Sequence, residues 1–167
     1  ANSSGDSNVA IGQGALDANT TADNNTTVGA RSLTTNTTGT ANVAMGKDAM
    51  YTNLTGSDNV AIGVGALDAN TSASQNVAVG SAALGANTTA TGNTAVGYNA
   101  LLLNLTGASN TAMGHNTLDA NTTGTQNTAL GHNSMSATTT GSYCTAVGGA
   151  TLSLHTTGAD NTAVGYS

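Results

Sequence analysis

The chain lacks several residue types on which ordinary globular folds depend. Its 167 residues include no Pro, Phe or Trp and only four Tyr, and charged residues make up 6%, against about 25% in a typical soluble domain. The apolar share is 38%, but much of it is Ala, which brings little apolar area. Because disordered chains are usually highly charged, we expect instead a thin repetitive fold, stabilised by backbone ladders and stacked side chains.

Charge and cysteine content exclude several kinds of partner and an internal disulfide. The chain has eight acidic residues, all Asp, and only Arg31 and Lys47 as bases, for a net charge of −6. Nucleic acids and anionic membranes attract clustered Lys and Arg, so we expect neither as a partner. No apolar run approaches the roughly 18 residues that a membrane span needs, and no signal-peptide pattern is present. The single Cys144 excludes an internal disulfide.

A 17-residue repeat runs through the sequence without insertions. Its anchor is Asn-x-Ala-aliphatic-Gly, which appears in phase ten times with few departures, from 8–12 to 161–165. Counted from that Asn, position 4 is always aliphatic or Met, position 5 is Gly, and position 9 is Leu or Met. Helical repeats need more than 30 residues and leucine-rich repeats at least 20. Seventeen residues suffice for one coil of two short strands and two turns.

We therefore predict an all-β fold, a parallel β-solenoid (β-roll) of ten 17-residue rungs with two short strands per rung. The first strand covers unit positions 2–4 and the second lies near positions 8–11, with Gly at positions 5 and 15 in turns that need positive φ. Stacked rungs lie about 4.8 Å apart, which makes a rod about 48 Å long. Residues 1–167 form one uninterrupted repeat domain without recognisable caps, so we expect a fragment or a filament subunit.

Two sets of repeated residues define the predicted interior. The core is expected from positions 4 and 9, namely Ile11, Leu16, Met45, Met50, Ile62, Leu67, Val96, Leu101, Met113 and Leu118. The leading Asn residues are expected to bond to their copies in a structural ladder, namely Asn8, Asn42, Asn59, Asn76, Asn93, Asn110, Asn127 and Asn161.

Signals of catalysis are absent from the sequence. Asp17, Asp68 and Asp119 share position 10 but lie three rungs apart, about 14 Å along the rod, which is too far for an acid–base pair. His115 and His132 are neighbours at position 6 without a Cys or carboxylate beside them, so they are better explained as exposed residues than as metal ligands. We predict no enzyme activity, no metal, no cofactor and no catalytic residues.

Positions 6 and 7 of three consecutive rungs form a candidate glycan-contact surface. Rings flanked by amides suit contacts to sugars, and the alternative is ordinary variation at an exposed position. The residues of this surface are Tyr98, Asn99, His115, Asn116, His132 and Asn133.

Position 12 carries a candidate modification signal, because it repeatedly begins Asn-x-Ser/Thr. A structural explanation competes with N-glycosylation, since Asn and Thr suit turns and ladders and a repeat copies one preference into every unit. The candidate acceptors are Asn2, Asn19, Asn36, Asn53, Asn70, Asn87, Asn104 and Asn121.

The repeated columns resemble two families of surface fibres. The stretch NTAVGYNAL at 93–101 resembles repeats of phage and virus tail-fibre proteins, and NVAIG at 8–12 and 59–63 is similar to YadA-like heads of trimeric autotransporter adhesins. The resemblance covers the whole chain, although the adhesin heads have a shorter repeat with an extra Ser after the Asn. It implies a β-roll, commonly trimeric, in a fibre that holds or makes receptor contacts.

We therefore expect a structural or adhesive extracellular fibre module, located outside the cell or on a cell or virion surface. Its expected partners are other copies of itself, as a homotrimer or an end-to-end filament, and cell-surface glycans. The alternative function is an ice-binding (antifreeze) β-solenoid, because Thr-rich regular coils form hydroxyl arrays. Adjacent Thr residues at positions 13 and 14 point to opposite faces, which disfavours this alternative.

Overall fold

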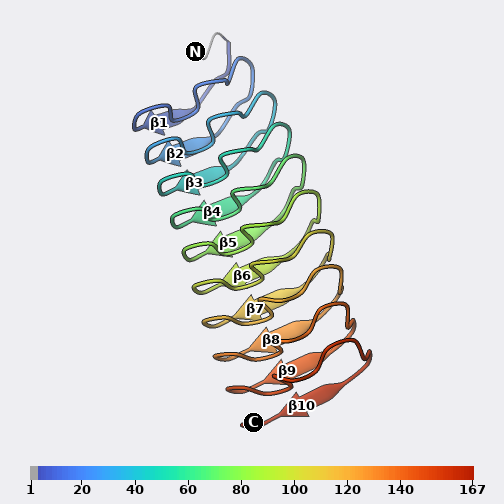
Figure 1. Ribbon diagram of the computed structural model, residues 1–167. Helices are drawn as coiled ribbons and strands as arrows, with labels where there is room; N and C mark the ends of the chain where they lie inside the picture. Colours follow the sequence, from blue (N-terminus) through green and yellow to red (C-terminus); the bar gives the residue numbers. More distant parts are fainter. Residues whose placement is uncertain (1–3) are drawn as a thin grey trace.

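The computed structural model describes residues 4–167, and these form a parallel β-solenoid, as the repeat predicts (Figure 1). Each rung contributes one three-residue strand, and the strands form one ten-stranded sheet in chain order. Neighbouring strands pair in parallel with a constant shift of one repeat, for example Val60 with Val77. The strands are β1 (Val9–Ile11), β2 (Thr26–Val28), β3 (Val43–Met45), β4 (Val60–Ile62), β5 (Val77–Val79), β6 (Thr94–Val96), β7 (Thr111–Met113), β8 (Thr128–Leu130), β9 (Thr145–Val147) and β10 (Thr162–Val164).

The second strand of each rung, predicted near unit positions 8–11, does not form in residues 4–167. A turn occupies these positions, because the residue at position 9 adopts a left-handed backbone: φ is 54° at Leu67 and 52° at Leu84. This conformation costs a non-glycine residue about 1–2 kcal/mol, which burial of a leucine, worth about 1.5–3 kcal/mol, offsets. Successive turns still bond to one another, since Leu67 N donates to Ala83 O at 2.9 Å.

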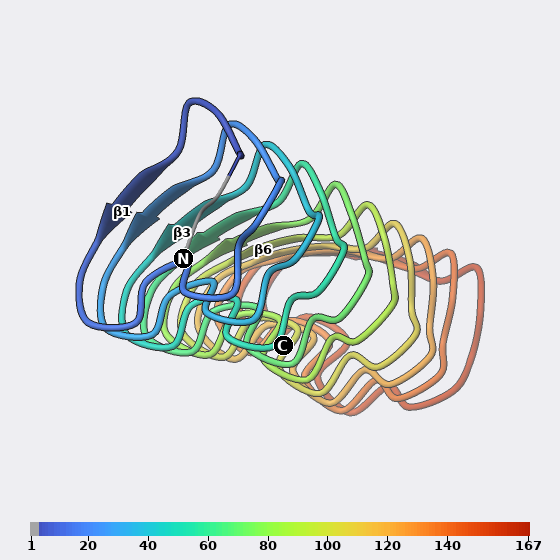
Figure 2. The same cartoon turned by 90° about the horizontal axis from the view of Figure 1, so that it is seen from above.

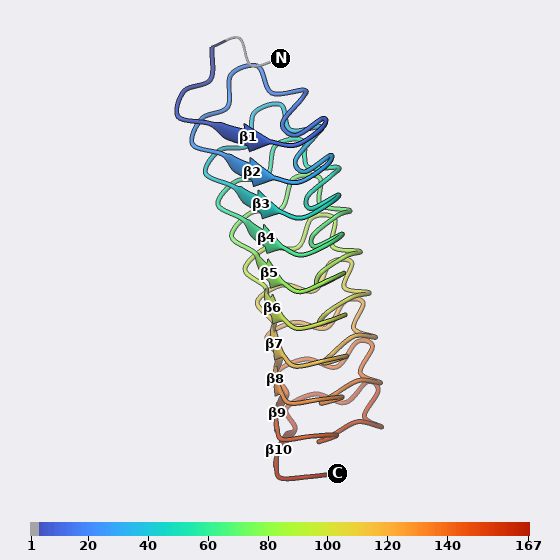
Figure 3. The same cartoon turned by 90° about the vertical axis from the view of Figure 1, so that its left-hand side faces the viewer.

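The rod is twisted about its long axis. Seen along the rod, successive rungs are rotated relative to one another (Figure 2). From the side, β1 to β3 lie across the view whereas the last strands are seen nearly end-on (Figure 3). The outer surface of the sheet therefore winds around the rod. Within residues 4–167 there is no helix long and apolar enough to cross a membrane.

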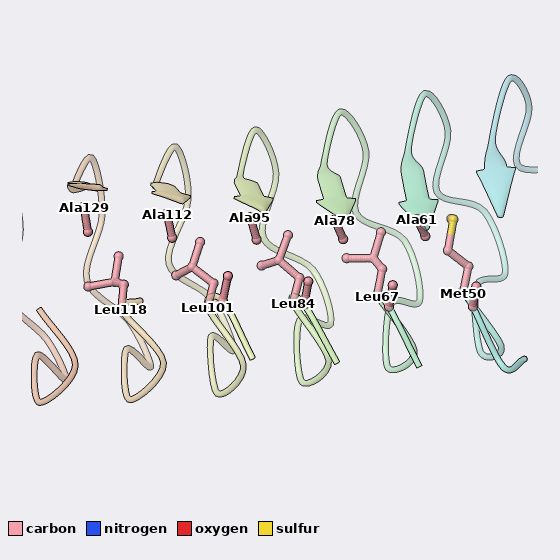
Figure 4. Close-up of a cluster of buried hydrophobic side chains, with 14 of the residues drawn as sticks. Met50, Ala61, Leu67, Ala78, Leu84, Ala95, Leu101, Ala112, Leu118 and Ala129 are labelled. Atoms are coloured by element: carbon pink, nitrogen blue, oxygen red, sulfur yellow. The ribbon is translucent and has the colours of Figure 1, made fainter. Parts of the chain in front are cut away.

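The interior is thin and holds one large side chain per rung. Leu or Met at position 9 points toward the Ala at position 3 in the middle of the strand (Figure 4). Leu67, Leu84 and Leu101, like Ala61 and Ala78, are fully buried. The core prediction is confirmed for position 9, that is for Leu16, Met50, Leu67, Leu101 and Leu118.

The core prediction is wrong for position 4. Side chains alternate along a strand, so the inward Ala at position 3 turns positions 2 and 4 outward. Ile11 is 59% exposed, Met113 45% and Met45 40%. Ile62 is also exposed, and Val96 is half-buried. The coil is too narrow for a second large side chain, and the larger residue of the strand therefore lies on the surface.

The predicted Asn ladder at position 1 is present along one inner corner of the coil. Asn42 Oδ1 accepts from the backbone N of Asn59 at 3.0 Å and from its Nδ2 at 3.2 Å. Asn59 Nδ2 also donates to Ala73 O at 2.9 Å. The backbone N–H to Oδ1 bond repeats in Asn76, Asn93, Asn110 and Asn127. Asn25, which the prediction omitted, joins it by donating from its backbone N to Asn8 Oδ1.

Position 5 of the repeat requires glycine for two structural reasons. Gly46 has φ of +133°, and a Cβ at this position would lie 2.5 Å from Gly63 O and 2.7 Å from Gly63 C. Both the backbone conformation and the close approach of the next rung therefore require glycine. The expectation of positive φ at position 15 is wrong, because Gly39, Gly56 and Gly107 lie outside the positive-φ set.

Candidate binding surfaces

The six residues of the predicted glycan-contact surface lie together, in the turns that follow β6, β7 and β8. The rings of Tyr98 and His115 stack with centroids 5.2 Å apart and planes 19° apart, and His115 and His132 follow at 5.3 Å and 23°. Beside them, Asn99 Nδ2 donates to Asn116 Oδ1 at 3.2 Å, and Asn133 N donates to His115 O at 3.0 Å. We call these three rings and three amides the ring ladder.

The chemistry of the ring ladder differs from that of a stacking platform. Because the rings face one another, the faces of the central His115 are covered. Tyr98, His115 and His132 are exposed and the neighbouring Asn residues are half-buried, so the ladder offers ring edges with a hydroxyl and imidazole nitrogens beside partly accessible amides. Such a row of donors and acceptors suits hydrogen bonding to a polyhydroxylated chain that runs along the rod.

The sequon column contradicts the N-glycosylation prediction. Asn19, Asn36, Asn53, Asn70, Asn87, Asn104 and Asn121 are all fully buried. In Asn53, Nδ2 donates to Asn36 Oδ1 at 2.9 Å and to Gly56 O at 3.0 Å, so both of its hydrogens are used. A sugar on Nδ2 would remove one donor and would need space that the interior lacks. Asn2 lies outside the described residues.

Position 12 therefore forms a second, interior Asn ladder. Asn70 Nδ2 donates to Asn53 Oδ1 at 2.7 Å, and Asn121 Nδ2 donates to Asn104 Oδ1 at 2.7 Å. Position 15 joins the two ladders, because Gly56 O accepts from Asn53 at position 12 and from Asn42 at position 1. The Asn of the pattern reflects packing of the coil, which was the competing explanation, whereas the Ser or Thr at position 14 is exposed.

Cys144 replaces Asn in the first ladder and weakens it. Its backbone N donates to Asn127 Oδ1 at 2.9 Å as in other rungs. Its Sγ lies 4.0 Å from Asn161 Nδ2 and offers no oxygen to the backbone N of Asn161. The predicted ladder is therefore interrupted before Asn161.

Replacing Cys144 by Asn is expected to stabilise the rod. The new Oδ1 would accept from the next rung, and a net hydrogen bond is worth about 1 kcal/mol, which corresponds to a rise of about 2–4 °C in thermal midpoint. Circular dichroism melts measure this rise. Cys144→Ala is the control, since it removes the thiol without adding an acceptor; an equal gain in both variants would contradict the ladder explanation.

Both bases of the chain lie in one cluster around Asp48. Arg31 Nε lies 2.8 Å from Asp48 Oδ1, Lys47 Nζ lies 3.2 Å from Asp48 Oδ2, and the Arg31 guanidinium lies 5.3 Å from the Tyr51 ring centroid. Burial raises the pKa of Asp48, but the hydrogen bonds and charges of Arg31 and Lys47 lower this pKa on balance. Asp48 thus partly compensates the two cations where they lie.

Asp68 and Asp119 lie in surroundings that disfavour their charged form. Burial is the largest cause of a raised pKa for both, and each has a buried Oδ1 without a hydrogen-bond partner. No group of three or more His, Cys or Asp side chains among residues 4–167 is arranged to hold a metal ion.

The pKa of these two carboxyls predicts a pH-dependent stabilisation by amides. A carboxyl with a raised folded pKa destabilises the fold when it is ionised, and this cost disappears as pH falls through that pKa. Asp68→Asn with Asp119→Asn is therefore expected to stabilise the rod at pH 7 and to lose this advantage near pH 3. Urea titrations at both pH values test it, with the exposed Asp58→Asn as control; an advantage of equal size at both pH values would contradict it.

A second candidate surface lies at positions 2 and 4 of the repeat, where the sequence placed position 4 in the core. The outward side chains of β1–β10, at positions 2 and 4, are Val, Ile, Leu, Met or Thr without exception. They form an uncharged stripe along the whole sheet, which we call the outer sheet face. The composition of both columns was visible in the sequence, but the direction of the side chains was not.

Comparison with known proteins does not assign the chain to a family. Neither family models, nor curated proteins, nor solved structures give a match to the chain.

Proposed function

We propose that the chain is a non-catalytic structural and adhesive module of an extracellular fibre, exposed on a cell or virion surface. The observation that carries the proposal is the unbroken register of ten parallel strands along one rod. Hydrogen bonds between rungs run along the rod and involve strands, turns and two Asn ladders. Such a body serves as a stiff spacer whose surface repeats at each rung.

The repeated surface also supports the adhesive part of the proposal. A column on the rod offers similar groups about every 4.8 Å, so an extended partner contacts many rungs at once. Weak contacts added in this way give useful avidity. The resemblance of NTAVGYNAL to tail-fibre repeats is consistent with this role.

Localisation in the intact source tests the proposal. Antibodies raised against the purified chain are applied to the cells or particles that produce it and viewed by electron microscopy with gold labels. Label along extended surface fibres is the expected result. Label confined to the cell interior would overturn the proposal.

The ring ladder predicts glycan binding by the module. The double variant Tyr98→Ala, His115→Ala removes two of the three rings, so binding on a glycan array is expected to fall about tenfold or more, as when one or two hydrogen bonds to a ligand are lost. Tyr143→Ala is the matched control, because Tyr143 is exposed and lies outside the ladder. Unchanged binding of the double variant would remove the ladder from the proposal.

The twist of the rod favours the fibre over ice binding. An ice crystal presents a flat plane, whereas the columns of the rod turn about its axis (Figures 2 and 3). Only a few rungs would meet such a plane together. A measurement of thermal hysteresis distinguishes the two functions, and we expect none.

A further inference from the structure

We infer that the outer sheet face is the surface on which another copy of this chain docks. This inference goes beyond the proposed fibre function, because it assigns self-association to a particular face. Each rung contributes two outward side chains to the face, for example Val77 and Val79 on β5 or Thr128 and Leu130 on β8. At position 4 the side chain is exposed in several rungs, as in Ile11 and Met113, and half-buried in others, and six of the ten residues at position 2 are Thr. An uncharged stripe of this kind, rich in apolar groups, marks an interaction surface.

Charge favours another copy as the occupant. The chain carries a net charge of −6, so most contacts between two copies bring like charges together. The outer sheet face holds no charged residue in any of its ten rungs. Two copies that meet through this face therefore bury apolar groups while their carboxylates stay outside the contact.

Shape also favours another copy. The face winds around the rod (Figure 2), so a straight or flat partner would leave it after a few rungs. A second copy has the same twist and the same rung spacing, so two copies that coil around each other keep their faces in contact along the rod, as the helices of a coiled coil do. Two such sheets pack face to face with interdigitating side chains, as the layers of a β-sandwich do.

The size of the face is sufficient for specific association. Ten rungs at about 4.8 Å and three-residue strands about 10 Å long give roughly 480 Å² per copy. Two copies then bury about 1,000 Å², which is where specific protein interfaces begin. We therefore expect association that depends on concentration rather than a permanent complex.

Sedimentation velocity over a range of concentrations tests the inference. The chain has a mass of 16.1 kDa, and species of two or more copies are expected to appear as concentration rises. Val79→Lys with Leu130→Lys places two charges on the face and is expected to weaken association about a hundredfold or more. The control Thr89→Lys with Thr140→Lys adds the same charge to the same rungs at exposed position 14 and is expected to associate like the unmodified chain.

A milder variant guards against misfolding of the lysine variant. Val43→Thr, Val60→Thr and Val77→Thr introduce into column 2 the residue that later rungs already carry, so the fold is retained while the face becomes less apolar. Weaker association in this variant, with unchanged circular dichroism, supports the inference. A monomeric unmodified chain at all concentrations, or oligomers that survive the lysine variant, would overturn it. Neither result affects surface labelling of fibres, which tests the proposed function separately.

Discussion

Gly46→Ala is expected to destabilise the rod by about 3 kcal/mol or more, the range of strained backbone combined with a backbone clash. The residue has φ of +133°, and an added Cβ would lie 2.5 Å from Gly63 O and 2.7 Å from Gly63 C. The next rung would have to move, and with it the bond from Gly63 N to Met45 O at 2.8 Å. A fall of about 6–12 °C in thermal midpoint follows for a chain of this size.

Gly65→Ala is the matched control for this prediction. Gly65 also has positive φ, at +64°, but nothing lies within 4 Å of an added Cβ. Its column holds Asp48 and Asn99 in the same left-handed conformation, so we expect a loss of about 1 kcal/mol or less. Circular dichroism melts of both variants give the comparison. Equal losses would mean that the approach of neighbouring rungs is not what fixes glycine in column 5.

The sequence predicts the period of the fold better than the direction of its side chains. Seventeen residues and an invariant Gly define a coil, and parallel pairing follows from stacking identical units. The choice between positions 3 and 4 for the interior depends on the width of the coil, which a local pattern does not contain. Ala61 is buried and Ile62 is exposed, the reverse of what hydrophobicity alone predicts, because the strand turns position 3 toward the position-9 side chains (Figure 4).

The turn around Leu67 illustrates a second limit of sequence reasoning. Leucine in a left-handed conformation is unfavourable in isolation, so local propensity favours an extended strand there. The rung closes only if the chain turns at this point, and burial of the side chain in the coil outweighs the local cost. The ring ladder was easier to predict, because residues that share a column in a register without insertions must lie side by side.

The sequons show how a motif can have two physical origins. Asn-x-Thr marks an acceptor for sugars, yet Asn is also the side chain that donates twice and accepts once in an interior ladder. Burial separates the two explanations, and burial was not available from the sequence. The structural role of the Asn at position 12 is therefore tested best by a substitution that keeps the shape of the side chain and alters its hydrogen bonding.

Asn53→Asp is expected to be among the most damaging substitutions in the chain at neutral pH. The side chain is fully buried, and the change replaces an amide that donates to Asn36 Oδ1 and Gly56 O by a carboxylate that faces two acceptors. An uncompensated buried charge costs about 3–5 kcal/mol. Asn70 Nδ2 at 2.7 Å would still donate to the carboxylate, which offsets only part of that cost.

The pH dependence of Asn53→Asp identifies the cause of the loss. Burial and two facing acceptors would raise the folded pKa of the new carboxyl above the unfolded value of about 3.9. Stability lost at pH 7 is therefore regained as pH falls through the folded pKa, when the protonated group can donate once. Asn24→Asp is the control, since Asn24 is exposed in a column that already holds Asp58 and Asp160. Urea titrations from pH 7 to pH 3 measure the free energy of unfolding of both variants. A small loss of stability at pH 7, or a large loss that persists at pH 3, would show that the interior ladder does not depend on the donors of its amides.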